Sequence, residues 1–227
     1  MKTLFPDRLR AVVFDLDGTL LDTAPEFVLV VQQLRAEHGL APLPEPQIQA
    51  TVSDGARAMV SLALAITPDD DEFEKNRLRF LDIYAASLGQ ATMPYPGISE
   101  LLLTLAEAGI AWGISTNKPS YLTNPLMAHM AMDPAPTSVV CPDHVKQPKP
   151  HPEPLLLNCK QLGCRPAEVI YIGDHLRDIQ AGRSAGMYTI AAAYGYIHPQ
   201  EDPASWGASS IAHSGTELEQ LISNALR

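Results

Sequence analysis

The chain has few cysteines, few basic residues and no long hydrophobic run. Its three cysteines, Cys141, Cys159 and Cys164, form neither an even-numbered disulfide framework nor a usual zinc-ligand spacing. We therefore expect reduced thiols that pack in the interior, as in proteins of a reducing compartment. The alternative, a zinc site that adds His144 to the three cysteines, fits this spacing poorly.

Basic residues are outnumbered by acidic ones. The chain has 16 lysines and arginines against 26 aspartates and glutamates, which gives a formal net charge of −10 at pH 7. Nucleic acids and anionic membranes favour a basic surface, so we expect neither as a partner. A small anionic substrate stays compatible with this charge, because a bound cation and a few basic side chains can reverse the field locally.

No uncharged apolar stretch is long enough to cross a bilayer, and residues 1–8 lack the apolar core of a signal peptide. We therefore expect a cytoplasmic protein without a membrane segment. The length of 227 residues suits one large domain or one and a half. The sequence leaves the oligomeric state open between a monomer and a homodimer.

Strand-like and helical segments alternate along most of the chain. Strands are expected at residues 11–15, 110–115, 138–141, 169–173, 188–192 and 209–212. Helices are expected at residues 98–108, 121–130, 153–162 and 176–185, and a last helix follows the capping box of Ser214 and Glu217. This alternation predicts an α/β fold with a doubly wound, Rossmann-like parallel sheet.

One segment interrupts the alternation. Thr23 and Glu26 are spaced like a capping box, and apolar residues then recur at helical spacing as far as residue 38. After a proline-rich stretch, helices are expected at residues 56–65 and from about residue 67 to about 88, with no strand-like run. We therefore predict a helical cap at residues 22–93, inserted into an α/β core formed by residues 1–21 and 94–227.

Polar residues collect where predicted strands end. The carboxyl ends of parallel strands meet at one edge of the sheet, where ligands bind in open α/β folds. Alone, each residue could be a helix cap, a turn former or a surface charge, but the joint pattern is hard to obtain by chance. Carboxylates gathered in this way repel one another unless a cation lies among them, and all-oxygen ligands favour Mg²⁺. The residues concerned are Asp15, Asp17, Thr116, Asn117, Lys149, Asp174 and Asp178.

The same segments resemble the motifs of the haloacid dehalogenase superfamily, in particular its phosphatase branch with a small helical cap after the first strand. The resemblance covers nearly the whole chain. It is carried by Asp15-Leu16-Asp17-Gly18-Thr19, by Thr116, by Lys149, and by Gly173-Asp174 with Asp178.

This resemblance implies a Mg²⁺-dependent phosphomonoester hydrolase that acts through an aspartyl phosphate on a small phosphorylated metabolite. Asp15 would be the nucleophile, Asp17 the general acid and base, and Lys149 the partner of both the nucleophile and the phosphate. The implied substrate-binding residues are Gly18, Thr116 and Asn117. The implied metal ligands are Asp15, the backbone carbonyl of Asp17, Asp174 and Asp178.

Two alternatives stay open. A phosphosugar mutase of the same superfamily would share all of these motifs. A signalling module could accept phosphate on Asp15, as receiver domains do, although the helical insert and Asp17 are superfluous for a mere acceptor. A dehalogenase needs no acid at Asp17. A phosphonatase lacks that acid and uses a cap lysine instead, and Lys75, the one lysine of residues 22–93, lies in a charged run.

The amino-acid sequence outside the motifs bears on the substrate. Overall, the motif sequences of the chain resemble those of phosphoglycolate phosphatases, whereas residues 141–146 and 194–199 look closer to the N-acetylmuramic acid 6-phosphate phosphatases of bacterial cell-wall recycling. Both substrates carry a carboxylate, which Arg57 of the predicted cap could clamp unless it is an exposed helix residue. His144, Tyr196 and His198 either contact the sugar or pack loops. His175 stands where relatives often have a small hydroxyl residue.

Overall fold

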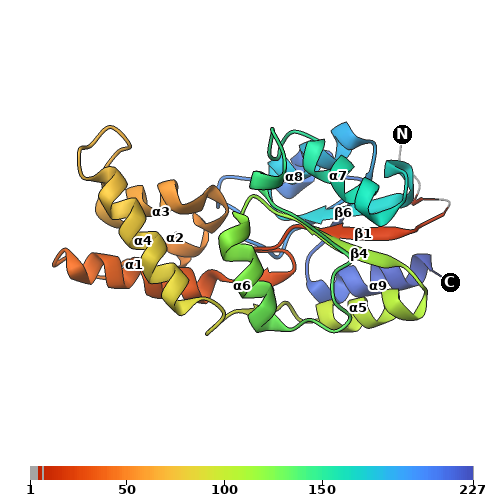
Figure 1. Cartoon of the computed structure of the whole chain (residues 1–227), viewed down its shortest axis with the longest axis horizontal. Helices are drawn as coiled ribbons and strands as arrows, with labels where there is room; N and C mark the ends of the chain where they lie inside the picture. Colours follow the sequence, from red (N-terminus) through yellow and green to blue (C-terminus); the bar gives the residue numbers. More distant parts are fainter. Residues whose placement is uncertain (1–4, 7, 227) are drawn as a thin grey trace.

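The computed structural model describes residues 5–6 and 8–226, and its centre is a parallel sheet (Figure 1). Within these residues the sheet has six strands in the order β5-β4-β1-β6-β7-β8, and every neighbouring pair is parallel. The strands are β1 (Ala11–Phe14), β4 (Ala111–Ser115), β5 (Ser138–Val140), β6 (Val169–Gly173), β7 (Tyr188–Ala192) and β8 (Ser210–Ala212). The predicted fold class is confirmed.

Strand β1 is apolar throughout because both faces of the sheet are covered. Val12 and Phe14 point into one hydrophobic core, whereas Ala11 and Val13 point into the other. The first core contains helices α5, α6 and α9, and the second contains α7 and α8, on opposite faces of the sheet (Figure 1). These helices are α5 (Ile98–Glu107), α6 (Ser120–Met130), α7 (Glu153–Leu162), α8 (Leu176–Ala185) and α9 (Gly215–Ala225).

The register of the sheet aligns the ends of its central strands. Phe14 at the end of β1 lies opposite Ile114 of β4 and Ile172 of β6. The amide of Asp15 donates to the carbonyl of Ile172 at 2.8 Å, so the ladder continues one residue beyond β1. The residues that follow these three strands therefore meet at one edge of the sheet.

A helical unit extends the molecule beyond that edge (Figure 1). It contains α1 (Ala24–Glu37), α2 (Glu45–Gln49), α3 (Gly55–Leu64) and α4 (Phe73–Ser87). The chain enters it through β2 (Leu21–Asp22) and leaves through β3 (Met93–Pro94), which pair antiparallel, so the two connections run side by side. The unit has its own apolar core, in which the ring of Phe27 stacks on those of Phe80 and Tyr84. An inserted helical unit is thus present, as the predicted fold class requires, whereas the domain bounds at residues 22–93 stay a prediction.

Local predictions failed in this unit for identifiable reasons. Helix α2 was missed because it lies in the proline-rich stretch, yet Pro46 is tolerated in a first turn, where its missing N–H needs no partner. Helix α4 begins at Phe73 rather than near residue 67, because the carboxylate of Asp70 accepts bonds from the amide and hydroxyl of Thr67 and holds a turn there. Strands β2 and β3 are too short to leave a sequence pattern.

The capping box predicted at Thr23 and Glu26 is wrong. The hydroxyl of Thr23 donates instead to Asp17 Oδ1 at 2.7 Å, and Glu26 Oε1 accepts bonds from the backbone of residues 91 and 92. The start of α1 is held by a distant residue, because the hydroxyl of Tyr196 accepts from the amides of Thr23 (2.6 Å) and Ala24 (2.8 Å). Tertiary partners therefore replace the local cap.

None of the helices in the described part of the chain combines the length and apolarity needed to span a membrane. Residues 1–4, 7 and 227, which the prediction assigned to the core, lie outside the described residues. So does most of the segment in which no signal peptide was expected.

The cap of α9 provides a stability test. The hydroxyl of Ser214 accepts from the amide of Glu217 at 3.0 Å, as predicted, whereas the Glu217 carboxylate accepts from His213 rather than from Ser214. We expect Ser214→Ala to lower the free energy of unfolding by about 1 kcal/mol in urea denaturation. The matched control is Ser99→Ala, at an exposed position of α5, which should leave the midpoint nearly unchanged. Equal losses in both variants would contradict the cap.

Candidate active site

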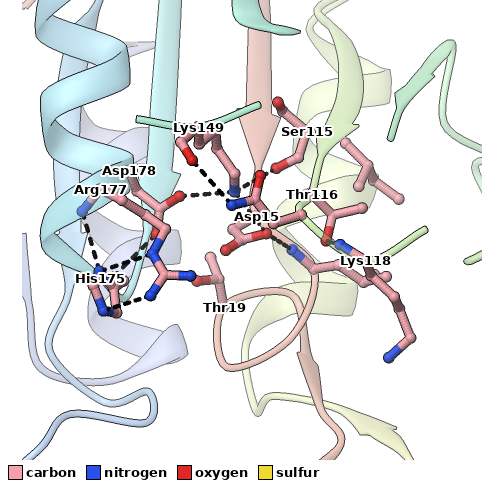
Figure 2. A network of polar contacts seen from close by, with 12 residues as sticks. Asp15, Thr19, Ser115, Thr116, Lys118, Lys149, His175, Arg177 and Asp178 are labelled. Atoms are coloured by element: carbon pink, nitrogen blue, oxygen red, sulfur yellow. Dashed lines mark hydrogen bonds and ion pairs between the residues drawn. The ribbon is translucent and has the colours of Figure 1, made fainter. Parts of the chain in front are cut away.

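Four of the predicted residues, Asp15, Thr116, Lys149 and Asp178, lie close together at the carboxyl edge of the sheet (Figure 2). Asp15 follows β1, Thr116 follows β4 and Asp174 follows β6. Lys149 comes from the loop between β5 and α7, and its ammonium lies 2.9 Å from Asp15 Oδ1 and 2.7 Å from Asp178 Oδ1. Four stretches that are distant in the sequence therefore form one cluster.

Lys149 is buried, and its charge is fully engaged. Its Nζ also donates to the carbonyl of Ser115 at 2.8 Å and to the hydroxyl of Tyr171 at 2.9 Å. Burial alone favours a neutral amine, but the carboxylates of Asp15 and Asp178 outweigh it and raise the pKa of Lys149. The ammonium is thus a fixed positive charge beside Asp15.

Three carboxylates at this edge have the spacing of a metal site. Asp15, Asp174 and Asp178 each offer an oxygen within 4.8 Å of the others. Burial raises the pKa of Asp174 to about 8, and the charges of Asp15 and Asp178 add to the effect. Burial also raises the pKa of Asp15 to about 6, against the opposing effect of Lys149. A hard divalent cation among these oxygens would remove the conflict, so the donor set fits such an ion.

The carboxylates of Asp174 and Asp178 each accept hydrogen bonds from the protein. Asp174 Oδ1 accepts from the hydroxyl of Thr19 at 3.2 Å, and its Oδ2 accepts from the amide of Tyr196 at 2.8 Å. Asp178 accepts from Tyr171 at 2.9 Å and from the amide of His175 at 3.1 Å. These bonds fix the carboxylates before any ligand arrives.

Gly18 is required where it lies. Its φ of +79° is in the left-handed region, and a Cβ atom built there would approach Asp174 Oδ2 to 2.1 Å. The close passage of the Asp17–Gly18 turn over Asp174 therefore needs glycine. Its predicted contact with the substrate stays a prediction.

The side chain of Asp17 lies outside the carboxylate cluster, beside Lys118. Lys118 Nζ is 2.8 Å from Asp17 Oδ1, and the lysine side chain is only 5% exposed. Its ammonium also lies 4.6 Å from the ring centroid of Tyr84 and 5.3 Å from that of Phe27, both in the helical unit. We expected carboxylates around Asp17, but the structure has a buried cation there. Sequence reasoning assigned no role to this lysine, because its partners come from three other segments.

Thr116 and Asn117 follow β4 at the same edge of the sheet and line the cavity there. The hydroxyl of Thr116 accepts from the amide of Lys118 at 3.1 Å, and Nδ2 of Asn117 donates to the carbonyl of Lys149 at 3.1 Å. The Asn117 side chain thus joins two of the predicted motifs. Its Oδ1 is buried and has no partner in the part of the chain that the structure describes.

A cavity of about 470 Å³ opens above these residues, between the sheet edge and the helical unit. Its polar floor includes Asp15, Asp17 and Lys149. Its opposite wall is mainly apolar. The apolar and aromatic residues of the lining include Phe27, Val52, Phe80, Leu81, Tyr84 and Leu122. A polar floor under a mainly apolar wall suits a small molecule that has a charged group and an apolar face.

Arg57 lies at the start of α3 and lines this cavity, as the clamp hypothesis requires. It is also exposed, and it pairs with Glu74 at 3.2 Å. His175 caps α8, and burial lowers its pKa, which favours the neutral ring. Arg177, which the sequence did not single out, donates to the carbonyl of Ser53 at 2.9 Å and so connects the core to the helical unit.

The other polar candidates, of which His144 and His198 are exposed, make hydrogen bonds to the backbone. His144 Nδ1 accepts from the amide of Cys141, and His198 Nδ1 accepts from the amide of Gln200. The Tyr196 hydroxyl holds the start of α1. These three residues are outside the cavity lining.

The three cysteines are free thiols. Burial raises the pKa of Cys159 to about 12, which suits a packed neutral thiol. Within residues 5–6 and 8–226, no group with the spacing of a metal site includes a cysteine. The alternative zinc site with His144 therefore finds no support.

Comparisons with known proteins agree with this geometry. A model of the haloacid dehalogenase-like hydrolase family matches residues 12–192. The chain is 49% identical over 219 residues to the N-acetylmuramic acid 6-phosphate phosphatase of Pseudomonas aeruginosa. This alignment covers 96% of this chain and 97% of that protein. It is 38% identical over 209 residues to the phosphoglycolate phosphatase of Xanthomonas campestris pv. campestris, with 92% and 94% covered.

Among solved structures, the fold is similar to a "predicted phosphoglycolate phosphatase from haemophilus somnus" with a TM-score of 0.83. The alignment covers 94% of this chain and 98% of that one. The sequence identity is 24%, so this similarity supports the fold alone.

The raised pKa values of Asp15 and Asp174 predict how stability depends on pH. Without a divalent cation, the folded state binds more protons than the unfolded state between pH 3.8 and about 8, so the free energy of unfolding should fall as the pH rises through this window. A cation favours the ionised carboxylates. Mg²⁺ should therefore raise the melting temperature more at the upper end of the window than at the lower end.

Thermal unfolding with EDTA and with Mg²⁺ at both ends of this window measures the effect. Asp174→Asn should remove most of the stabilisation by Mg²⁺, whereas Asp202→Asn, an exposed aspartate, should keep it. A Mg²⁺ effect that is larger at the lower pH would contradict the assignment of the cluster.

Proposed function

Because the chain belongs to the haloacid dehalogenase-like hydrolase family, we propose that it hydrolyses a phosphate monoester through a phosphorylated Asp15. The observation that carries this proposal is the Asp15–Lys149 pair at 2.9 Å on the floor of the cavity. The pair puts a carboxylate nucleophile beside a fixed positive charge, where an anionic phosphate can approach.

The reaction would proceed in two steps. In the first, an oxygen of Asp15 attacks phosphorus while Asp17 gives its proton to the departing alkoxide, which leaves as the alcohol. In the second, Asp17 takes a proton from water, the hydroxide attacks the phosphorus of the aspartyl phosphate, and inorganic phosphate leaves. Splitting the reaction in this way replaces one very slow hydrolysis, which can require accelerations of up to ~10²¹-fold, by two easier steps.

Other residues of the site would bind and neutralise the phosphate. The hydroxyl of Thr116, with Asn117 and the Gly18 turn, would hold the phosphoryl oxygens. Asp15, Asp174 and Asp178, with the backbone carbonyl of Asp17, would hold Mg²⁺, which fits their oxygen donors. When bound, the cation would supply positive charge that offsets the repulsion between the anionic nucleophile and the anionic phosphate.

We propose a sugar phosphate that carries a carboxylate, such as N-acetylmuramic acid 6-phosphate, rather than 2-phosphoglycolate. The relative with that activity in its name is 49% identical, against 38% for the phosphoglycolate phosphatase. A cavity of about 470 Å³ is also within the range that encloses ligands larger than phosphoglycolate. In this view, residues 22–93 form the cap that shields the phosphate from water.

The same proposal includes the cellular compartment and the oligomeric state. We propose a cytoplasmic enzyme, since its free thiols suit a reducing compartment. A monomer or a homodimer would be equally compatible with a site that is built from residues of one chain.

Replacing the nucleophile tests the phosphatase activity. We expect Asp15→Asn to abolish the release of inorganic phosphate from N-acetylmuramic acid 6-phosphate with Mg²⁺, because a neutral amide cannot form the aspartyl phosphate. The control Asp70→Asn, at an exposed loop of the helical unit, should keep full activity.

The same assay separates the alternatives. Isomerised sugar phosphate in place of free phosphate would indicate a mutase. A stable phosphorylated protein without turnover would indicate an acceptor module. Unimpaired hydrolysis by Asp15→Asn would refute the mechanism.

Lys118 provides a second test, as a residue that positions Asp17. We expect Lys118→Met to lower kcat by about 10-fold or more, because the partly buried carboxylate of Asp17 loses its counter-ion and its orientation. KM should stay within about 2-fold, because Lys118 is assigned to orient Asp17 rather than to bind the phosphate. The exposed Lys146→Met should change neither quantity. A rise in KM with an unchanged kcat would contradict this positioning role.

A further inference from the structure

Two arginines of the helical unit share one glutamate beside the cavity. Arg57 Nη1 lies 3.2 Å from Glu74 Oε1, and Arg77 Nε lies 2.8 Å from Glu74 Oε2 and 3.1 Å from Oε1. Both arginines line the cavity. Two guanidinium charges against one carboxylate leave one net positive charge at this point, in a protein whose formal charge is −10.

Arg57 and Arg77 have N–H donors that Glu74 does not occupy, and contacts with neighbouring residues orient them. A guanidinium carries N–H groups on all three of its nitrogens, and Glu74 occupies one nitrogen of each arginine. Among the described residues, the remaining nitrogens of Arg57 and Arg77 have no hydrogen-bond partner. Arg57 also lies over the ring of Phe73, at 5.1 Å from its centroid, which fixes its orientation. The arrangement is a preformed site for one more anionic group.

Helix α4 sets the distance between this pair and the catalytic end of the cavity. Phe80, Leu81 and Tyr84 lie three, four and seven residues after Arg77, and all four line the cavity, so they share one helix face. At the Tyr84 end, this face meets Lys118, the partner of Asp17. Seven residues separate Tyr84 from Arg77, which corresponds to about 10 Å along the helix axis.

These observations define the shape of the substrate. A phosphate would bind at Asp15 and a second anion at the arginines, which are about 10 Å along α4 from Tyr84. Phe80 and Leu81 form an apolar wall of the cavity between Tyr84 and Arg77. Phosphoglycolate is too short, because one methylene group joins its phosphate ester oxygen to its carboxylate. A sugar ring that carries phosphate on one side and a carboxylate on the other has the required length.

We propose that Arg77, together with Arg57, binds the carboxylate of a phosphorylated sugar acid and selects it over the neutral sugar phosphate. The inference rests on the proposed function and extends it to a residue of α4. Carboxylates suit this pair because a guanidinium binds them through two parallel hydrogen bonds. Glu74 holds both arginines in the free protein and competes with the incoming carboxylate.

The test compares two substrates that differ in the carboxylate. N-acetylmuramic acid 6-phosphate carries a lactyl ether that N-acetylglucosamine 6-phosphate lacks. We expect Arg77→Ala to lower kcat/KM for the first by about 10- to 100-fold, mainly through KM, because a charged hydrogen bond is lost. For the second substrate the change should stay within about 2-fold. Arg57→Ala should show the same selectivity, and Arg77→Lys should recover part of the loss.

Two further variants sharpen the comparison. Arg79→Ala is the matched control, since Arg79 lies on the same helix, pairs with Glu37 at 2.6 Å and is outside the cavity lining. This variant should leave kcat/KM unchanged for both substrates. Glu74→Gln removes the competing carboxylate and should lower the KM for N-acetylmuramic acid 6-phosphate alone.

The outcomes separate this inference from the proposed function. Equal losses of kcat/KM for both substrates, or no loss for either in the two arginine-to-alanine variants, would overturn the role of the arginine pair while the wild-type enzyme still released phosphate. Failure of the wild-type protein to hydrolyse any phosphate ester would instead refute the proposed function.

Discussion

The burial of one ammonium among carboxylates at the edge of the sheet organises this molecule. Lys149 is almost fully enclosed, and its charge is matched by Asp15 and Asp178 at hydrogen-bond distance. Removing one partner of such a pair leaves an uncompensated charge in a low-dielectric environment, which costs several kcal/mol. The parallel strands make the arrangement possible, because their register brings the ends of β1, β4 and β6 to the same level.

The sheet edge and the helical unit together form the cavity. The sheet supplies charged groups, and the helices supply an apolar wall and further cations above them. Lys118 belongs to both parts, since it pairs with Asp17 of the core and packs on aromatic rings of the helices. Arg177 makes a second such contact through Ser53. The chemistry of the cavity therefore depends on how the two parts meet.

Most of the core could be predicted from the sequence, because its signals are local. The apolar run of β1 and the residues after each strand end, such as Asp15 and Asp174, indicate a buried parallel sheet with polar groups at one edge. The missed features depend on distant partners. Nothing near Thr23 shows that Tyr196 takes over the helix cap, and nothing near Lys118 shows that Asp17 neutralises it. Side chains that bridge the two parts of the molecule leave no periodic pattern.

Tyr196 is engaged at both of its ends. Its amide donates to Asp174, and its hydroxyl accepts from the first amides of α1 and donates to Asp22 at 2.8 Å. The helical unit cannot swing about its two connecting strands without either breaking the bonds of this hydroxyl or pulling on the carboxylate. Any hinge motion of the helical unit is therefore coupled, through Tyr196, to the position of Asp174 in the acidic cluster.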